Sequence, residues 1–350
     1  MKAVVCYGNG VVKYEEVPTP PIQPHMVKVA VRAAGICGSD IPRAMAQGAH
    51  SYPIILGHEF AGVVAEVGEG VVSVSPGDHV AGVPLIPCFR CENCQKGDYA
   101  LCKHYSFIGS RQPGAFAEFV LAPQQNVFKL HPQITFEQGA LFEPSTVALH
   151  ALRLVDYQPG GTVAILGSGT IGIFALQWAK ILGARKIVVF GRDRQHLTLS
   201  QRLGATITIS TLDDSFMEQA LDFIGGNGFD YVFETAGSVH TMQYAFELAA
   251  NKARVCFIGT PTEDLCFSPH LWEKMNRKEF LLTGSWMSYS NPFPGQEWKM
   301  TEEHFANGQL LFDEAMLFRK IPFAQAADAF HLFETPSTIK GRILLTNFHD

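Results

Sequence analysis

The sequence predicts an α/β protein of two domains, in which a small irregular β-barrel is joined to a doubly wound parallel sheet. Three observations lead to this prediction. The first part of the chain is rich in short β-type segments, the part after Thr162 alternates strand-like and helix-like segments, and the total of 350 residues exceeds one usual compact core.

The first predicted domain is β-rich. Val27, Val29 and Val31 alternate with other residues, and further strand-like segments cover residues 62–67 and 78–83, the second of them behind the turn Pro76-Gly77. Short strands separated by glycine and proline are typical of a small irregular barrel.

The second predicted domain repeats the order strand, helix, strand. Residues 163–166 form an apolar strand, 171–182 a helix and 186–190 the next strand, and further apolar strands cover 231–233, 255–258 and 280–283. Continuous apolar strands alternating with helices predict a parallel sheet with both faces covered. After Gly284 the sequence becomes irregular and aromatic, and residues 341–345 again resemble a strand.

Composition and charge exclude several classes of function. The chain is 47% hydrophobic and 17% charged, with a net charge of −6. Since there is no basic excess to neutralise phosphates, we expect no nucleic-acid partner and no anionic membrane partner. No apolar segment reaches the length of a membrane span or of a signal core, so we expect a cytoplasmic protein with a small-molecule substrate.

The spacing of four cysteines is the most specific signal in the chain. They are separated by two, two and seven residues, at Cys88, Cys91, Cys94 and Cys102. Four thiolates in a short hydrophilic loop can complete a tetrahedral shell, which predicts a structural zinc. The alternative of four buried or disulfide-bonded cysteines is disfavoured by this spacing. Isolated Cys6, Cys256 and Cys266 are interpreted as small apolar residues of the core.

A second set of metal-binding residue types is dispersed along the chain. It comprises a thiolate, an imidazole and two carboxylates, at Cys37, His58, Glu59 and Glu143. Such a mixture suits a divalent metal of borderline softness, and zinc is the best candidate. The alternative is that Glu59 pairs with a base and His58 fills a core position. Glycines at 57, 62 and 68 favour the metal site, because they permit tight turns or close approach there.

The pattern Gly57-His58-Glu59-x2-Gly62-x5-Gly68-x2-Val71 resembles that of the zinc-containing, medium-chain alcohol and polyol dehydrogenases. The resemblance extends to Cys37-Gly38-Ser39-Asp40, the four-cysteine loop and Glu143-Pro144. It implies a GroES-like barrel domain at 1–151 and 286–350, and a Rossmann domain at 152–285.

The resemblance also implies roles for individual residues. Cys37, His58 and Glu59 would bind a catalytic zinc, and Glu143 would bind it directly or through the metal's water. That zinc would act as a Lewis acid on a substrate alcohol, whose hydride passes to a nicotinamide. Ser39 would carry the proton away, or else be a structural hydroxyl, and Asp40 would orient the metal ligands.

Within the family, the likeness is greatest to the branch that acts on polyol phosphates. It lies in Gly48-Ala49-His50, in residues 107–111, and in the runs 284–289 and 294–298. His50, Arg43 and Arg111 flank the metal-bearing segments and are candidates to bind a phosphate, whereas each taken alone would more often have an exposed or structural role. Tyr289 takes the place of a tyrosine that contacts sugar hydroxyls, while Ser288 replaces that tyrosine's arginine neighbour. Trp286 and Phe116 could line the substrate pocket or belong to the core.

A dinucleotide fingerprint follows the strand at 163–166. Its residues are Gly167, Ser168, Gly169, Thr170, Ile171 and Gly172, and they open the next helix. The glycines allow a pyrophosphate to approach the helix N-terminus. The second strand ends in Gly191-Arg192-Asp193-Arg194 instead of an acidic residue. Gly191, Arg192 and Arg194 would suit the 2′-phosphate of NADP, whereas Asp193 could take the ribose of NAD, so the cofactor is predicted as NAD or NADP.

These observations together predict a zinc-dependent, NAD(P)-linked polyol-phosphate dehydrogenase with two zinc ions per chain. An unphosphorylated polyol or threonine dehydrogenase is the alternative enzyme, and a catalytically silent nucleotide-binding protein is the alternative of another class. From the resemblance, a homodimer or homotetramer is expected.

Overall fold

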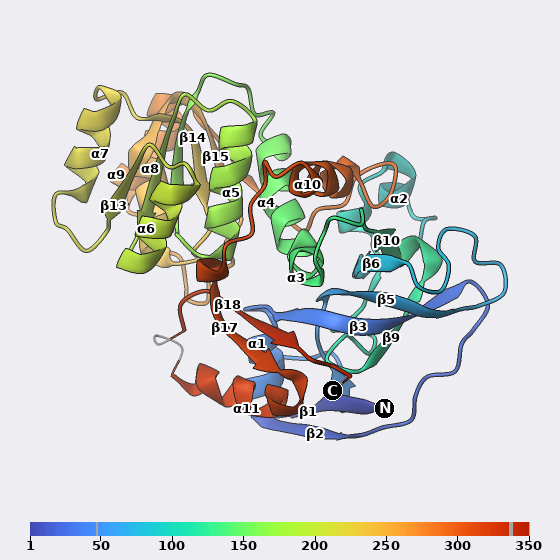
Figure 1. The fold of residues 1–350 in the computed structure, drawn as a ribbon. Helices are drawn as coiled ribbons and strands as arrows, with labels where there is room; N and C mark the ends of the chain where they lie inside the picture. The colour runs from blue at the N-terminus through green and yellow to red at the C-terminus, as the bar shows by residue number, and fades with distance from the viewer. Residues whose placement is uncertain (47, 336–338, 350) are drawn as a thin grey trace. The chain divides into compact units, whose positions relative to one another are not determined.

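The computed structural model describes residues 1–46, 48–335 and 339–349, and its contacts divide the chain into two compact units (Figure 1). The first unit comprises Met1–Glu143, Tyr289–Gly308 and Leu317–Asp350, and the second comprises Pro144–Ser288 and Gln309–Met316. One unit is β-rich and the other is built on a parallel sheet, so the predicted α/β fold class is confirmed. The domain limits given above stay a prediction.

The first unit is built around a mixed sheet with the strand order β10-β6-β5-β3-β18-β17, in which β9 also pairs with β3. Val27, Val29 and Val31 of β3 are fully buried, as their alternation predicts. The strands of this sheet are β3 (Met26–Ile36), β5 (Glu59–Val67), β6 (His79–Gly82), β9 (Phe119–Pro123), β10 (Val127–Lys129), β17 (Leu317–Pro322) and β18 (Arg342–Thr346).

The register of this sheet positions the candidate metal ligands. Strand β3 ends one residue before Cys37, and its Gly35 lies opposite Glu59, the first residue of β5. On the other side of β3, Ile36 lies opposite Ile343 of β18. Residues that are distant in sequence are therefore brought to one end of three adjacent strands, which Figure 1 shows lying side by side.

Smaller elements complete the first unit. Strands β1 (Lys2–Gly8), β2 (Val11–Glu16) and β4 (Ile54–Ile55) form one sheet, and β7 (Leu85–Ile86) pairs with β8 (Ser106–Phe107). The helices are α1 (Asp40–Met45), α2 (Glu92–Lys96), α3 (Phe136–Ala140), α10 (Gln296–Ala306) and α11 (Ala326–His331), with 3-10 turns at Tyr99–Leu101, Gln124–Asn126, Phe323–Gln325 and Leu332–Glu334.

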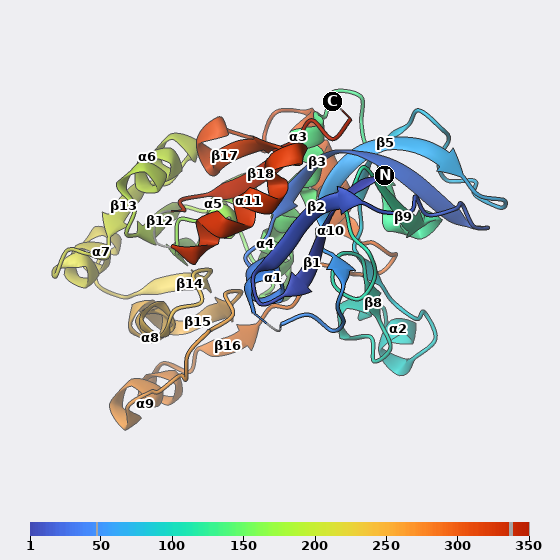
Figure 2. The same cartoon turned by 90° about the horizontal axis from the view of Figure 1, so that it is seen from below.

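The second unit has a parallel sheet with the strand order β13-β12-β11-β14-β15-β16. Helices α5 and α6 cover one face and α8 and α9 the other, as Figure 2 shows. This is the predicted doubly wound arrangement. The strands are β11 (Thr162–Leu166), β12 (Lys186–Gly191), β13 (Ile207–Ser210), β14 (Phe229–Glu234), β15 (Ala249–Phe257) and β16 (Leu281–Gly284).

The helices of the second unit begin and end at typical capping residues. Asp193, Ser238 and Ser268 each accept a hydrogen bond from the first turn of the helix that follows. These helices are α5 (Thr170–Ile181), α6 (Arg194–Leu203), α7 (Phe216–Ile224), α8 (Val239–Leu248) and α9 (Pro269–Lys278), and a 3-10 turn covers Glu314–Met316. Helix α4 (Phe142–Leu154) begins in the first unit and continues in the second.

Each unit has its own apolar core. Val29, Phe60 and Phe116 are fully or almost fully buried in the first, and Val188, Val232 and Phe246 in the second. Within the described ranges, every helix is too short or too polar to cross a membrane. The predicted cytoplasmic location stays a prediction.

Candidate functional site

The structure brings three of the predicted catalytic metal ligands together. The sulfur of Cys37, a ring nitrogen of His58 and a carboxylate oxygen of Glu59 all lie within 4.8 Å of one another. Cys37 follows β3, while His58 and Glu59 lie at the start of β5. A thiolate, an imidazole and a carboxylate at this spacing fit the coordination shell of zinc.

Two glycines make this arrangement possible. Gly57 has a φ of +97°, and a Cβ there would lie 2.5 Å from the ring of Phe116, so only glycine allows the turn that presents His58. Across the sheet, a Cβ on Gly35 would overlap the carboxylate of Glu59. The backbone of β3 therefore leaves room for that carboxylate.

Asp40 contacts two of the ligand residues. It is fully buried, its Oδ2 accepts a hydrogen bond of 3.0 Å from the Cys37 amide, and its Oδ1 lies 3.4 Å from His58 Nδ1. With Nδ1 facing Asp40, Nε2 is the nitrogen available to a metal, which is how carboxylates commonly orient metal-binding histidines. Burial acts to lower the pKa of His58, but the charges of Asp40 and Cys37 outweigh it and raise that pKa well above its usual value.

The buried carboxyl groups of this site are suited to binding a cation. Burial raises the pKa of Glu59, against the opposing effect of Arg342, and burial also raises the pKa of Glu143 to about 7. In the described part of the chain, Asp40 Oδ1 and both carboxylate oxygens of Glu59 are buried without a hydrogen-bond partner. Such groups are costly unless a charge compensates them, so the residues present fit a bound divalent metal.

Glu143 lies near this group, at the start of α4. The charges of His58, Cys37, Arg342 and Asp40 all act on its carboxyl, although part of the residue stays accessible to solvent. That proximity is compatible with a bond to the metal or to the metal's water. Which of the two it makes stays a prediction.

Sequence reasoning missed Arg342, the first residue of β18. Its side chain is almost fully buried, its Nη2 lies 3.1 Å from Glu59 Oε1, and its Nη1 donates a 3.0 Å hydrogen bond to the carbonyl of Ile36. The local pattern around Arg342 indicates only a strand. Its approach to the site follows from the pairing of β18 with β3, which local sequence does not reveal.

Ser39, the predicted proton carrier, precedes α1 and is exposed. Arg43 Nη1 donates hydrogen bonds to its carbonyl oxygen at 2.8 Å and to its Oγ at 2.9 Å. Because Oγ accepts from Arg43, its own proton remains available to another acceptor. Its role in proton transfer stays a prediction.

The four-cysteine loop closes as predicted. The sulfurs of Cys88, Cys91, Cys94 and Cys102 lie within 4.8 Å of one another, around helix α2. The backbone N–H groups of Cys94 and Lys103 help to lower the pKa of Cys91 to about 6, whereas burial raises the pKa of Cys94 to about 12. All four sulfurs can become thiolates when a cation neutralises them, so this donor set fits a structural zinc.

The dinucleotide fingerprint joins strand β11 to helix α5. A glycine-rich turn between a strand and a helix is the position at which such a fingerprint binds a dinucleotide. Gly167 has a φ of +116°, and a Cβ there would lie 2.6 Å from the hydroxyl of Thr235. A Cβ on Gly172 would overlap the carbonyl oxygen of Gly167. Thr235 was missed by sequence reasoning; its hydroxyl donates a 3.0 Å hydrogen bond to the Leu166 carbonyl and fixes the turn to β14.

At the end of β12, Gly191 lies beside Ser168. A Cβ on Gly191 would overlap the hydroxyl of Ser168 and lie 3.0 Å from its Cβ. Asp193 Oδ1 accepts a 2.9 Å hydrogen bond from the His196 amide and so caps α6. Arg192 and Arg194 are exposed, and neither forms an ion pair within residues 1–46, 48–335 and 339–349.

The predicted substrate residues lie in different surroundings. Tyr289 is 2% exposed, and its hydroxyl accepts from the Leu85 amide at 3.4 Å; burial, with a contribution from Glu143, raises its pKa well above the usual value. His50 and Arg111 are exposed in the first unit. Trp286 is 54% exposed in the second unit, and its role stays a prediction. Phe116, by contrast, belongs to the core.

Comparison with known proteins identifies the family. The model for the alcohol dehydrogenase GroES-like domain matches residues 23–132, and that for the zinc-binding dehydrogenase domain matches residues 170–303. Galactitol 1-phosphate 5-dehydrogenase of Escherichia coli (strain K12) is 40% identical over 332 residues, which cover 93% of this chain and 95% of that protein. The chain belongs to the zinc-containing medium-chain alcohol and polyol dehydrogenases.

Other relatives of this dehydrogenase are named for different substrates. Sorbitol dehydrogenase of Bacillus subtilis (strain 168) is 34% identical over 269 residues, covering 75% of this chain and 76% of that protein. Because relatives named for different polyols are all similar to this chain, the comparison identifies it as a polyol-type dehydrogenase. The exact substrate has to be tested by experiment.

Solved structures confirm the predicted fold of this dehydrogenase. The crystal structure of galactitol-1-phosphate dehydrogenase from Escherichia coli superposes with a TM-score of 0.93 and 38% identity, over 99% of this chain and 100% of that one. A protein described as a zinc-binding dehydrogenase from Sinorhizobium meliloti, solved bound to NADP, gives a TM-score of 0.88 and 30% identity over 99% and 98% of the two chains. The predicted cofactors, zinc and NAD or NADP, are confirmed at the level of the family.

Proposed function

We propose that this dehydrogenase oxidises a secondary alcohol of a polyol phosphate to a ketone, converting galactitol 1-phosphate to tagatose 6-phosphate. In this reaction the alcohol loses a hydride to NAD(P)⁺ and a proton to solvent. The observation that carries the proposal is a zinc-type ligand set within a chain similar over almost its whole length to galactitol 1-phosphate 5-dehydrogenase.

The catalytic metal would be held by Cys37, His58 and Glu59, with Glu143 close by. Zinc in this position supplies a Lewis acid that favours loss of the substrate's hydroxyl proton near neutral pH. Asp40 holds the imidazole and the Cys37 backbone in place for it.

The substrate's proton would leave through Ser39. Arg43 fixes this hydroxyl by donating to its oxygen, and the exposed position of Ser39 connects it to solvent. Tyr289 would contact the polyol from the buried side near Glu143. The neighbouring Ser288 is buried, and its hydroxyl lies 2.7 Å from that of Thr146, so this position offers no cation to a free polyol.

For the cofactor, three features support NADP over NAD. Gly191 has no room for an acidic side chain beside Ser168, and Oδ1 of Asp193 is engaged in capping α6. Ser168 is 7% exposed, and its hydroxyl makes no hydrogen bond in the described part of the chain. Together with the exposed guanidinium of Arg192, it offers donors to a 2′-phosphate.

The assembly proposed is a homodimer paired through β16, with a homotetramer as the alternative. Strand β16 stands at the end of the parallel sheet and exposes 57% of Leu281, and α9 beside it exposes 47% of Trp272. A strand edge next to apolar surface is suited to pairing with a second copy. Light scattering on the purified protein gives the mass, and Leu281→Lys should shift it toward the monomer.

An unphosphorylated polyol dehydrogenase is the second candidate, because the Bacillus subtilis sorbitol dehydrogenase is also similar. A silent nucleotide-binding protein is disfavoured, since such a protein has no use for the converging ligand set.

The deciding experiment measures initial rates with galactitol 1-phosphate, galactitol and sorbitol, each with NAD and NADP, on protein of known zinc content. We expect turnover chiefly with the phosphate ester. Equal or better turnover of the free polyols would refute the phosphate-ester assignment.

A further inference from the structure

Two arginines and a histidine lie on segments beside the candidate metal centre. Arg43, His50 and Arg111, called the cationic cluster below, come from α1, from the loop after it and from the loop after β8. Burial lowers the pKa of His50, and the positive charges of Arg111 and Arg43 add to this effect, so the two arginines act on His50 electrostatically and favour its neutral ring.

Hydrogen bonds tie Arg43 to the residue Ser39 and tie the loop that carries His50 to α1. Arg43 donates to Ser39, two residues after Cys37. The loop that carries His50 is tied back to α1, because Tyr52 OH donates to the Arg43 carbonyl at 2.5 Å and accepts from the Ala49 amide at 3.1 Å. These bonds fix the loop without using the side chain of His50.

Arg111 belongs to a loop that packs against the segment of the ligand His58. In the loop of Arg111, Ala115 donates a 2.9 Å hydrogen bond to the Gly57 carbonyl, and the ring of Phe107 lies 5.6 Å from that of His58. The guanidinium of Arg111 lies over the ring of Tyr105 at 4.5 Å, which orients it. The cationic cluster is therefore built onto the segments that carry Cys37 and His58.

The charge of the cluster is not compensated by the protein. Arg111 forms no ion pair in the described ranges, and Arg43 has only a 3.9 Å approach to Asp40, which already contacts His58. Like charges placed together disfavour the folded state unless an anion joins them. Arginine and histidine N–H groups are the donors that phosphate monoesters accept in proteins.

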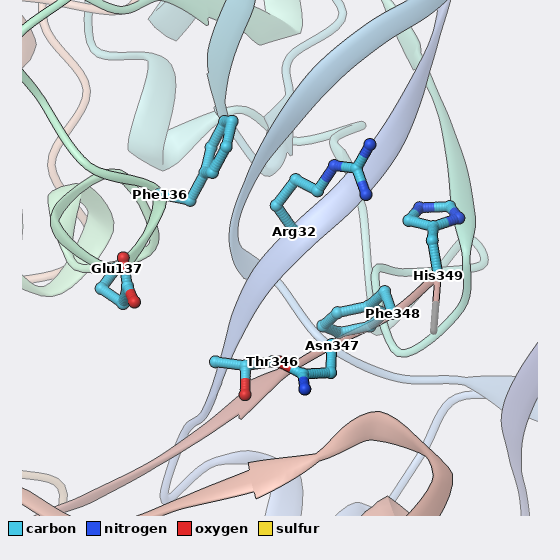
Figure 3. Close-up of a pocket in the computed structure, with 7 residues that line it drawn as sticks. All are labelled: Arg32, Phe136, Glu137, Thr346, Asn347, Phe348 and His349. Atoms are coloured by element: carbon cyan, nitrogen blue, oxygen red, sulfur yellow. The ribbon is translucent and has the colours of Figure 1, made fainter.

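A second arginine-lined cavity in the same unit is a competing candidate for the phosphate site. A polar cavity of about 250 Å³ lies in the same unit. Figure 3 shows Arg32 and His349 among the residues that line it. Arg32 precedes Cys37 by five residues of extended chain, about 16 Å at 3.3 Å per residue, which is too far for one sugar phosphate to span. The carboxylate of Glu137 also lines this cavity and would repel a phosphate.

We propose that the cationic cluster of Arg43, His50 and Arg111 binds the phosphate group of the substrate, so that it selects a phosphate ester over a free polyol. The inference rests on the proposed function and assigns that function's specificity to particular side chains. In this proposal Arg43 has two roles: it binds the phosphate, and its Nη1 donates a hydrogen bond to the hydroxyl of Ser39 near the reacting alcohol.

The test compares Arg111→Gln, His50→Gln and their double variant with the unaltered enzyme. The measured quantity is the ratio of kcat/KM for galactitol 1-phosphate to kcat/KM for galactitol, with the inhibition constant of inorganic phosphate against galactitol oxidation. We expect each single variant to lower the ratio about tenfold or more, since a charge-assisted hydrogen bond to the ester alone is lost. Arg111→Lys should recover part of the ratio, because it keeps the charge and loses the fork geometry.

Arg32→Gln is the matched control, because it removes an exposed arginine of the same unit outside the cluster. Its ratio should equal that of the unaltered enzyme. If Arg111→Gln and His50→Gln behave like Arg32→Gln while the unaltered enzyme prefers the ester, the cluster is refuted and the proposed function stands. If the unaltered enzyme has no preference for the ester, the proposed function fails, and unchanged phosphate inhibition in the variants would then refute the cluster as an anion site as well.

Discussion

The guanidinium of Arg342 lies 3.1 Å from a carboxylate oxygen of Glu59, and both side chains are buried. The pair joins the last strand of the chain to the candidate metal ligands. Arg342 also donates to the carbonyl of Ile36, one residue before Cys37. Arg342 thus fixes the backbone just before Cys37 and offsets the charge of Glu59.

Replacing Arg342 by methionine should destabilise the enzyme and weaken its hold on the catalytic metal. The variant leaves the carboxylate of Glu59 buried without its partner, a change that typically costs about 3–5 kcal/mol. Thermal unfolding and zinc content measure the two effects. The control is Arg319→Met on neighbouring β17, where the arginine is exposed. Equal stability and zinc content in the two variants would show that the Arg342–Glu59 pair does not support the site.

Cys37→Ala and His58→Ala should each abolish turnover while the fold survives. Both residues converge at the metal site, so each loss should also reduce zinc content from two ions per chain toward one. Circular dichroism checks the fold, and metal analysis counts the zinc. Cys266→Ala is the control, because Cys266 is exposed in the second unit and does not belong to the core as its sequence context suggested. Retained turnover in a folded, zinc-depleted His58→Ala protein would contradict the mechanism.

Cys91→Ser should remove the other zinc and loosen the loop around α2. This loop depends on its four sulfurs, since metal binding supplies the folding energy of such small lobes. Limited proteolysis between residues 88 and 105 should become faster, and one zinc should remain bound at the catalytic site. Protection from proteolysis equal to that of the unaltered enzyme, with one zinc lost, would show that the lobe folds without its metal.

Arg192→Ala should weaken NADP binding about tenfold and leave NAD binding almost unchanged, because only NADP carries the 2′-phosphate. Dissociation constants from quenching of protein fluorescence provide the measurement. Arg277→Ala, at an exposed arginine paired with Glu273 on α9, is the matched control. Tighter binding of NAD than of NADP, indifferent to Arg192→Ala, would overturn the proposed cofactor preference.

Thr235→Val should lower cofactor affinity by releasing the fingerprint turn. Valine keeps the shape that fills the space beside Gly167 but cannot donate to the carbonyl of Leu166. A loss of about 1 kcal/mol is expected for one such bond, and it should raise KM for the cofactor more than it lowers kcat. Thr235→Ser should restore most of the affinity. If Val and Ser behave alike, the hydroxyl has no positioning role.

Local sequence was sufficient for much of the fold and for the ligand types. Apolar strands alternating with helices predicted the parallel sheet, because burial on both faces leaves that pattern in the chain. The cysteine spacing predicted the loop around α2, since its four ligands lie close in sequence. Gly57-His58-Glu59 was recognisable for the same reason.

The sequence by itself determined the α/β class, the fingerprint between β11 and α5, and the residue types that bind metal, because each depends on neighbours within a few positions. Only the tertiary structure decided that Arg342 reaches Glu59, that Thr235 fixes the turn at Gly167, and that the loop of Arg111 packs against the segment of His58. These relationships depend on strand order and loop packing, where partners far apart in the chain meet. No local sequence pattern predicts these contacts, because the whole core determines which strands pair.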